Sequence, residues 1–272
     1  MKIAVTGATG FLGSYVLREL SKYDHEIIAI HRKSNHKIEK FKNLKFENID
    51  ISKQYCDLFT KLQSPDLLIH LAWDGLPNYN SLHHFEKELP IQYNFIKNLV
   101  EAGLKSIFIT GTCFEYGNKS GQLSTEINTE PTNPYGFAKD SLRKELEFLK
   151  NFHDFNFIWA RLFYLYGEGQ SQNSLYTSLK NAVERGDEIF NMSGGEQIRD
   201  FLPVEAVAKN IVDIALNIKN SETINICSGV PISVRSLVEK WIDDNNWKIK
   251  LNRGFYPYPD YEPMCFWGLK HL

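Results

Sequence analysis

The chain begins with a glycine-rich turn between a predicted strand and a predicted helix, and this turn limits the folds open to it. Residues 6–13 read TGATGFLG and directly follow the apolar segment 2–6. Such a turn needs glycine where the backbone approaches a pyrophosphate and where the helix packs on the sheet. The helix N-terminus then offers free N–H groups to the phosphates. An ordinary strand-to-helix turn is the alternative, but the context favours a dinucleotide site formed by Gly7, Gly10, Phe11, Leu12 and Gly13.

Strand-like and helix-like segments alternate along most of the chain. We predict strands at residues 2–6, 25–31, 44–49, 67–72, 106–110, 157–162 and 223–226, and helices at 15–21, 91–102, 137–152, 175–185 and 205–218. Strands separated by helices indicate a parallel sheet covered on both faces. The predicted fold class is therefore α/β, a Rossmann-type doubly wound parallel sheet with a small C-terminal substrate-binding cap. We expect the NAD(P)-binding domain over 1–165, with 203–228 returning to it, and the cap over 166–202 and 229–272.

Charge and composition exclude several classes of partner. The 31 Lys and Arg residues balance 33 Asp and Glu residues, for a formal net charge of −2, so we expect no nucleic-acid partner. No apolar run approaches the ~20 residues that span a bilayer, and the N-terminal segment lacks signal-peptide features. We therefore expect no membrane partner and a cytoplasmic location. The four cysteines are scattered without a CxxC pair, which argues against a zinc site, and we expect no metal.

The segment after the second predicted strand bears on cofactor choice. An acidic side chain there would bind the adenosine ribose of NAD, whereas this chain has Arg32 and Lys33. Arginine can grip a 2′-phosphate through two hydrogen bonds, so we predict that NADP(H) is preferred, with NAD(H) as the alternative. A solvated basic turn is the competing interpretation. Further contacts are predicted along the adenine and beneath the cofactor, at Asp50, Ile51, Leu71 and Ala72.

Tyr135 and Lys139 form a YxxxK pattern at the start of a predicted helix. Their four-residue spacing places both side chains on one helix face. A phenol with a pKa of about 10 is a poor acid–base group at neutral pH, and a nearby ammonium favours its phenolate form. YxxxK also occurs by chance on helix surfaces. Its position after the fifth predicted strand, together with Thr112, favours a catalytic site.

These segments together resemble one protein family. The chain is similar to an extended short-chain dehydrogenase/reductase of the NAD(P)-dependent nucleotide-sugar epimerase/dehydratase family, and the resemblance covers nearly its whole length in the right order. The matching segments are 6–13 (TGATGFLG), 70–72 (HLA), 111–117 (GTCFEYG), 133–139 (NPYGFAK), 161–167 (RLFYLYG) and 199–201 (RDF). The resemblance implies that Tyr135 is the acid/base, that Lys139 is its partner and a ligand of the nicotinamide ribose, and that Thr112 binds the reacting sugar oxygen. It also implies that Arg199 binds the nucleotide diphosphate and that Tyr164 contacts the sugar or its phosphates.

The positions after Thr112 separate the reactions of this family. Dehydratases carry two acidic groups there, whereas this chain has Cys113 and Phe114, which argues against elimination. Epimerase-reductases place a cysteine two residues before the Tyr-Gly pair, where this chain has Phe114, and use a histidine that is absent between residues 161 and 199. Cys113 is one position away from that cysteine. We therefore expect Cys113 to be a small residue lining the substrate site.

Two more segments narrow the predicted reaction. Residues 71–79 (LAWDGLPNY), which include the predicted substrate contact Trp73, and 261–268 (YEPMCFWG) resemble bacterial reductases of nucleotide-linked 4-keto-6-deoxy sugars. The resemblance implies an NAD(P)H-dependent carbon-4 ketoreductase that makes precursors of surface polysaccharides. A carbon-4 epimerase with tightly bound NAD, and a non-catalytic NAD(P)-binding regulator, are the alternatives. The nucleotide base, the sugar and the product stereochemistry stay open.

The expected partners are a nucleotide-sugar substrate and a second copy of the chain. The predicted helices 91–102 and 137–152 carry apolar residues on more than one face. Family members pair these two helices with those of a partner in a four-helix interface. We therefore predict a homodimer.

Overall fold

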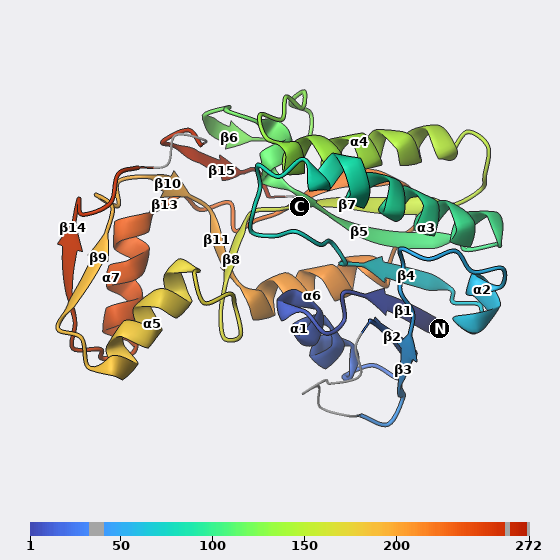
Figure 1. Ribbon diagram of the computed structural model, residues 1–272, viewed down its shortest axis with the longest axis horizontal. Coiled ribbons are helices and arrows are strands. Elements are labelled where there is room, and N and C mark those ends of the chain that lie inside the picture. Colours follow the sequence, from blue (N-terminus) through green and yellow to red (C-terminus); the bar gives the residue numbers. More distant parts are fainter. Residues whose placement is uncertain (33–40, 259–261, 271–272) are drawn as a thin grey trace.

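The computed structural model describes residues 1–32, 41–258 and 262–270. Within these residues the centre of the molecule is a seven-stranded sheet in which every pair of neighbouring strands is parallel (Figure 1). In sheet order the strands are β12 (Glu222–Ile226), β7 (Asn156–Leu162), β5 (Ser106–Thr112), β4 (Leu67–His70), β1 (Lys2–Thr6), β2 (Glu26–His31) and β3 (Leu44–Asn48).

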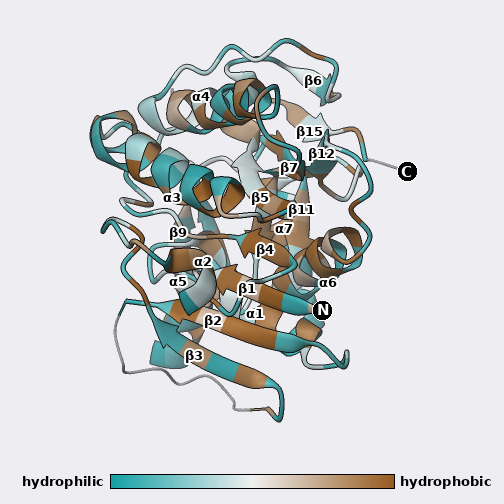
Figure 2. Ribbon diagram, turned by 90° about the vertical axis from the view of Figure 1, so that its right-hand side faces the viewer, coloured by the Kyte–Doolittle hydropathy of each residue, from teal (hydrophilic) through white to brown (hydrophobic). Residues whose placement is uncertain are grey.

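Helices cover both faces of this sheet. One face carries α1 (Phe11–Leu20) and α6 (Val204–Ala215), and the other carries α3 (Leu89–Glu101) and α4 (Pro134–Leu149), with the short α2 (Leu58–Lys61) beside them (Figure 2). The central strands read as continuous apolar runs, such as LLIH in β4, in which all four residues are buried. Such runs are typical of parallel strands buried on both faces. The predicted Rossmann-type α/β fold is confirmed.

The strand order reverses between β1 and β4. From β1 the chain moves outward through β2 and β3, and it then returns to β4 on the other side of β1. Thr6 and His70, the last residues of β1 and β4, are register partners at this point. In doubly wound sheets, ligands bind in the crevice outside the carboxyl ends of the strands at such a reversal.

Several predicted boundaries are wrong by two to four residues, for identifiable reasons. Helix α4 begins at Pro134 and not at residue 137, because the Asn133 side chain accepts the Gly136 N–H at 2.8 Å and proline suits the first turn. Strand β4 ends at His70 because the N–H groups of Leu71 and Ala72 donate to the Thr6 hydroxyl, both at 3.2 Å, and not to a neighbouring strand. Helix α1 begins at Phe11 and not at residue 15.

A smaller cluster of elements packs at one end of the molecule, at the left of Figure 1. Its apolar centre includes Leu179, Val238 and Trp241, contributed by helices α5 (Leu175–Arg185) and α7 (Val234–Asp244). Strands β9 (Ile189–Met192) and β14 (Lys250–Arg253) pair beside them. Short strands connect this cluster to the central sheet: β8 (Tyr164–Tyr166) with β11 (Phe201–Pro203), β10 (Ile198–Arg199) with β13 (Ile232–Ser233), and β15 (Phe266–Gly268) with β6 (Gly121–Leu123). Among the described residues, no helix has both the length and the apolar composition to cross a membrane.

Candidate active site

The glycine-rich turn adopts a shape that side chains would block. A Cβ atom on Gly7 would lie 2.8 Å from the Ala72 nitrogen, and Gly7 has φ of +65°. A Cβ atom on Gly13 would lie 2.1 Å from the Gly7 carbonyl oxygen. Gly10 caps helix α1 without any side-chain hydrogen bond, so the helix N-terminus can receive an anionic ligand. The turn therefore fits a dinucleotide phosphate.

A cavity of about 250 Å³ extends from this turn along the carboxyl ends of the strands. It is lined by seven of the predicted cofactor residues: Gly7, Gly10, Arg32, Asp50, Ile51, Leu71 and Ala72. Phe11, Leu12 and Gly13 form the start of α1 and are not among the residues that line this cavity, and Lys33 lies outside the described residues. Sequence reasoning missed other lining residues, among them Ser52 and Asp74 in loops after strands and Glu88 and Gln92 in the helical segment 84–101. Their approach to the cavity depends on contacts between distant segments, which leave no periodic signal.

Arg32 meets a carboxylate at the edge of this cavity. Its guanidinium lies 3.3 Å from the Asp74 side chain, and the two side chains are 60% and 54% exposed. The Gly75 N–H and the Arg32 charge hold the pKa of Asp74 below its usual range. This edge of the cavity thus carries one described cation, Arg32, together with the carboxylates of Asp50 and Asp74.

The three predicted catalytic residues come together at the end of β5. Thr112 is the last residue of that strand, Tyr135 lies in the first turn of α4, and Lys139 follows one turn later. The Thr112 side chain lies close enough to the Tyr135 phenol to lower the pKa of that phenol. The Lys139 ammonium donates to the Thr110 carbonyl at 2.7 Å. All three side chains are buried.

Burial sets the proton affinities of this pair. It raises the pKa of Tyr135 well above its ordinary value, a rise that the neighbouring Thr112 side chain opposes. Burial lowers the pKa of Lys139 to about 7, against the opposing charges of Glu115 and Glu88. Displaced pKa values of a phenol and an amine in one buried site are typical of acid–base chemistry.

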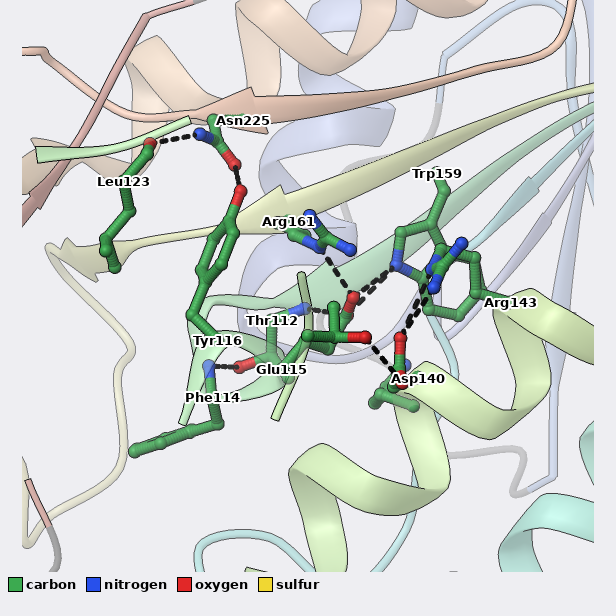
Figure 3. A network of polar contacts seen from close by, with 12 residues as sticks. Thr112, Phe114, Glu115, Tyr116, Leu123, Asp140, Arg143, Trp159, Arg161 and Asn225 are labelled. Carbon is green, nitrogen blue, oxygen red and sulfur yellow. Dashed lines mark hydrogen bonds and ion pairs between the residues drawn. The ribbon is translucent and has the colours of Figure 1, made fainter. Parts of the chain in front are cut away.

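Thr112 is held by a buried ion pair that sequence reasoning did not find (Figure 3). Its N–H donates to Glu115 at 2.8 Å, and the Arg161 guanidinium donates to the same carboxylate at 2.7 Å. The Trp159 indole adds a third donor at 2.9 Å. Burial raises the pKa of Glu115, while Arg161 opposes that rise. The motifs contained both charged residues, but their pairing depends on the adjacent positions of β5 and β7.

A second polar chain connects the glycine-rich turn to the loop after β4. The Thr6 hydroxyl and His70 Nδ1 lie 2.8 Å apart, and His70 Nε2 lies 2.7 Å from the Gln92 side-chain carbonyl oxygen. Because the Gln92 amide donates to Glu88 at 2.8 Å, its oxygen accepts from His70 Nε2–H, and His70 is the neutral tautomer that accepts from Thr6. Burial lowers the pKa of His70 to about 3.

The predicted substrate residues Cys113, Tyr164 and Arg199 converge on a carboxylate. Glu262 accepts hydrogen bonds from the Tyr164 hydroxyl and from the Arg199 guanidinium, the latter at 2.8 Å. Arg199 also donates to the Ile198 carbonyl at 2.9 Å and is buried. The ion pair of Arg199 with Glu262 is buried, with the two side chains 4% and 9% exposed. Burial raises the pKa of the Cys113 thiol, so the thiol stays protonated at neutral pH.

A second cavity, of about 440 Å³, lies between residues 77–80 and 170–174. Uncharged amide, hydroxyl and phenol groups predominate in its lining, which consists of Pro77, Asn78, Tyr79, Asn80, Gln170, Ser171, Asn173 and Ser174. It adjoins the catalytic residues, because the Tyr135 N–H donates to the Tyr79 carbonyl at 3.1 Å. The predicted substrate contact Trp73 lines the first cavity and meets the Tyr135 ring edge to face, with centroids 5.9 Å apart.

Comparison with known proteins decides the family. The family model described as NAD dependent epimerase/dehydratase family matches residues 3–227. The chain belongs to this family. It is 32% identical over 275 residues to the dTDP-6-deoxy-L-talose 4-dehydrogenase (NAD(+)) of Aggregatibacter actinomycetemcomitans. The alignment covers 99% of this chain and 100% of that relative. It is 24% identical to the CDP-abequose synthase of Salmonella typhimurium, over 80% of this chain and 71% of that one.

Solved structures agree on the fold of this epimerase/dehydratase chain. MoeE5 in complex with UDP-glucuronic acid and NAD superposes with a TM-score of 0.84 at 22% identity, over 100% of this chain and 90% of that one. A UDP-N-acetylglucosamine 4-epimerase from Methanobrevibacter ruminantium superposes with a TM-score of 0.83 at 23% identity, over 100% of this chain and 89% of that one. At these identities the likeness concerns the fold alone.

Proposed function

We propose that the protein interconverts a ketone and an alcohol at carbon 4 of a nucleotide-linked 6-deoxyhexose, with reduction as the productive direction. The observation that carries the proposal is the buried group formed by Thr112, Tyr135 and Lys139 beside a dinucleotide-type cavity. The first relative described above is named a 4-dehydrogenase of a dTDP-6-deoxy sugar, which is the same chemistry in the oxidative direction. We further propose that the product serves the synthesis of surface polysaccharides.

The side chains supply proton transfer and oxygen binding. A nicotinamide dinucleotide, when bound, supplies the hydride. Tyr135 donates its phenolic proton to the oxygen that becomes the alcohol, and Thr112 hydrogen-bonds the same oxygen. Lys139 in its charged form lowers the free energy of the resulting phenolate. Cys113 and Phe114 follow Thr112 and bear no carboxylate, so this site lacks the acid and base for eliminating water.

Two opposite charges at the cavity edge, those of Arg32 and Asp74, bear on the choice of cofactor. The chemistry of Arg32 suits the 2′-phosphate of NADPH, and Lys33 adjoins it in the sequence. Asp74 opposes that preference, because it pairs with Arg32 and can itself accept from ribose hydroxyls. The relative named above uses NAD(+). We propose that the protein binds NADPH in preference to NADH and that Asp74 limits the preference.

The substrate is proposed to lie between the two lobes. In this arrangement residues 1–165 and 203–228 bind the dinucleotide, while 166–202 and 229–272 bind the nucleotide sugar. The amide-rich cavity between 77–80 and 170–174 suits the neutral hydroxyls of a sugar. Arg199 is proposed to meet the diphosphate, which requires it to share its donors with Glu262 or to exchange them.

The proposed homodimer uses an aromatic stripe on α4. The stripe consists of Phe137 and Phe148, which lie eleven residues apart on one face of α4, and of Phe152 in the turn after the helix ends at Leu149. These side chains are 50%, 70% and 82% exposed, respectively. Phe85 packs against Phe137 from the neighbouring turn, with ring centroids 5.9 Å apart. Large apolar side chains in a contiguous exposed stripe are typical of a protein interface.

The test is cofactor turnover with nucleotide-linked keto sugars. Loss of NADPH absorbance upon addition of dTDP-, CDP- or GDP-linked 4-keto-6-deoxyhexoses supports the proposal. A carbon-4 epimerase is the second candidate, since structural neighbours include such enzymes. Interconversion of carbon-4 epimers without added cofactor, by protein purified with bound NAD, would replace the reductase by the epimerase.

A further inference from the structure

Lys139 faces an aromatic ring in a buried site. Its ammonium nitrogen lies 4.0 Å from the centroid of the Trp73 ring. Its hydrogen bond to the Thr110 carbonyl, at 2.7 Å, uses one of three donors. Among the residues that the structure describes, no carboxylate forms an ion pair with this ammonium within 4.0 Å. After the Thr110 carbonyl oxygen, the face of the indole is therefore the next group of negative potential in contact with the charge.

The Trp73 ring is itself held by a histidine. The indole N–H donates to His84 Nδ1 at 3.1 Å, and His84 Nε2 lies 2.8 Å from the Asn78 carbonyl oxygen. An indole nitrogen only donates and a carbonyl only accepts, so these contacts assign the neutral His84 tautomer with its proton on Nε2. Trp73 is thus linked through His84 to the loop that lines the proposed sugar cavity.

We propose that Trp73 is a positioning residue that holds the Lys139 ammonium in its charged form by a cation–π contact, and that His84 fixes the indole in that position. The inference concerns this chain's own side chains, and only its consequence for turnover rests on the proposed function. It adds to Trp73 a role distinct from direct contact with the substrate.

The contact with Trp73 affects the charge of Lys139 because the pKa of this residue lies close to neutral pH. Burial lowers the pKa of Lys139 to about 7, so a modest extra interaction decides how much of the ammonium is charged at neutral pH. An aromatic face favours the cation and therefore raises this pKa. Four titratable residues surround Lys139, and each comes from a different element: His70, Glu88, Glu115 and Tyr135.

The proposal predicts the direction in which loss of the indole shifts the pH dependence of turnover. The proposed reaction needs charged Lys139, which is present below its pKa and is lost as the pH rises through it. Removing the indole face lowers that pKa, so the alkaline limb of the pH–rate profile moves to lower pH. The acidic limb of the pH–rate profile depends on other groups, so we expect it to stay at the same pH.

The test measures Lys139 directly by NMR titration of protein carrying isotope-labelled lysine, with the signal assigned by Lys139→Met. Trp73→Leu removes the ring face and is expected to lower the pKa of Lys139 by about one unit. Trp73→Phe keeps a ring but cannot donate to His84, so a smaller decrease is expected. Trp247→Leu, a half-buried tryptophan between α7 and β14, is the matched control and leaves the pKa unchanged.

An unchanged Lys139 pKa in folded Trp73→Leu overturns the cation–π role, whatever the enzyme's substrate. An unchanged pKa in His84→Phe overturns the anchoring role of the histidine. Circular dichroism identifies variants that fail to fold. Because the titration needs no turnover, failure of the proposed reaction and failure of this inference give different results. Where turnover is measured, the alkaline limb of Trp73→Leu shifts in the same direction as the titration.

Discussion

The Arg161 guanidinium donates to the Glu115 carboxylate at 2.7 Å, with both side chains out of solvent. The same carboxylate accepts the N–H of Thr112. The ion pair joins β7 to the short 3₁₀ helix 113–116 that follows β5, and it thus fixes the end of β5 that carries the predicted oxygen-binding threonine. This relationship couples the stability of the fold to the geometry of the site.

Arg161→Met is expected to destabilise the protein by about 3–5 kcal/mol, because it leaves the Glu115 carboxylate buried without its cation. Urea unfolding monitored by circular dichroism gives the free energy of unfolding. Asp244→Asn, which breaks an exposed pair with Lys240, is the control and should change that free energy by less than about 1 kcal/mol. A loss in Arg161→Met no larger than the control's would contradict the role given to the pair.

His70 makes the stability depend on pH in a predictable direction. Its folded pKa of about 3 lies below the ordinary value of 6.5, so the unfolded chain binds the proton more readily between these values. The free energy of unfolding therefore falls as the pH drops from 6.5 toward 3, by about 1.4 kcal/mol per pH unit from this residue. Urea titrations across that window should show a shallower fall in His70→Gln. His153→Gln should keep the wild-type slope, and equal slopes in all three proteins would count against the assignment.

The cofactor pocket allows a paired test of charge. Arg32→Asp should reduce the preference for NADPH over NADH by about 1.5–3 kcal/mol, because a charge-assisted hydrogen bond is lost. Asp74→Asn should increase that preference, because it frees Arg32 from its partner. Calorimetric dissociation constants of both nucleotides provide the measurement. Unchanged ratios in both variants would mean that this edge of the cavity does not meet the 2′ position.

The aromatic stripe on α4 predicts a dimer that a single charge disrupts. Phe148→Glu should convert the protein to a monomer at micromolar concentration, since it places a charge in an apolar interface. Phe255→Glu alters an aromatic side chain that is 57% exposed at the other end of the molecule and should leave the dimer intact. Size-exclusion chromatography with light scattering measures the mass. A monomeric wild-type protein would refute the assembly.

The sequence was sufficient for the sheet and for the proximity of Thr112, Tyr135 and Lys139, because both depend on local patterns. The apolar runs of β1 and β4, the glycine spacing before α1 and the YxxxK spacing on α4 can each be read within a few residues. Contacts between distant segments were not predictable in this way. Arg199 meets Glu262 across sixty-three positions, and Arg32 meets Asp74 across forty-two, so neither pairing leaves a periodic signal.

The shortest elements were also missed, for a physical reason. Strands such as β10 and β13 contain two residues each, too few for an alternation of buried and exposed side chains. Trp73 shows the same limit for side chains. Its place in the sequence predicted a substrate contact, whereas its ring lies over the Lys139 ammonium and its indole N–H donates to His84, the first residue of the short helix 84–88.

Removing the phenolic proton isolates the chemistry from binding. Tyr135→Phe keeps the ring and its packing but cannot protonate the sugar oxygen, so kcat should fall by about 10²–10⁴. Dinucleotide affinity should survive, which calorimetry checks. Tyr23→Phe removes an exposed hydroxyl far from the site and should retain wild-type turnover. Equal turnover in Tyr135→Phe and wild type would exclude the phenol as the proton donor.

The most direct test of the central claim follows the hydride itself. NADPH deuterated at the transferring position is incubated with the protein and a nucleotide-linked 4-keto-6-deoxyhexose, and the product is analysed by mass spectrometry and NMR. We predict one alcohol carrying a single deuterium at carbon 4. Carbon-4 epimers that form without added cofactor, with no deuterium transferred from NADPH to any of the keto sugars, would contradict the assignment as a reductase.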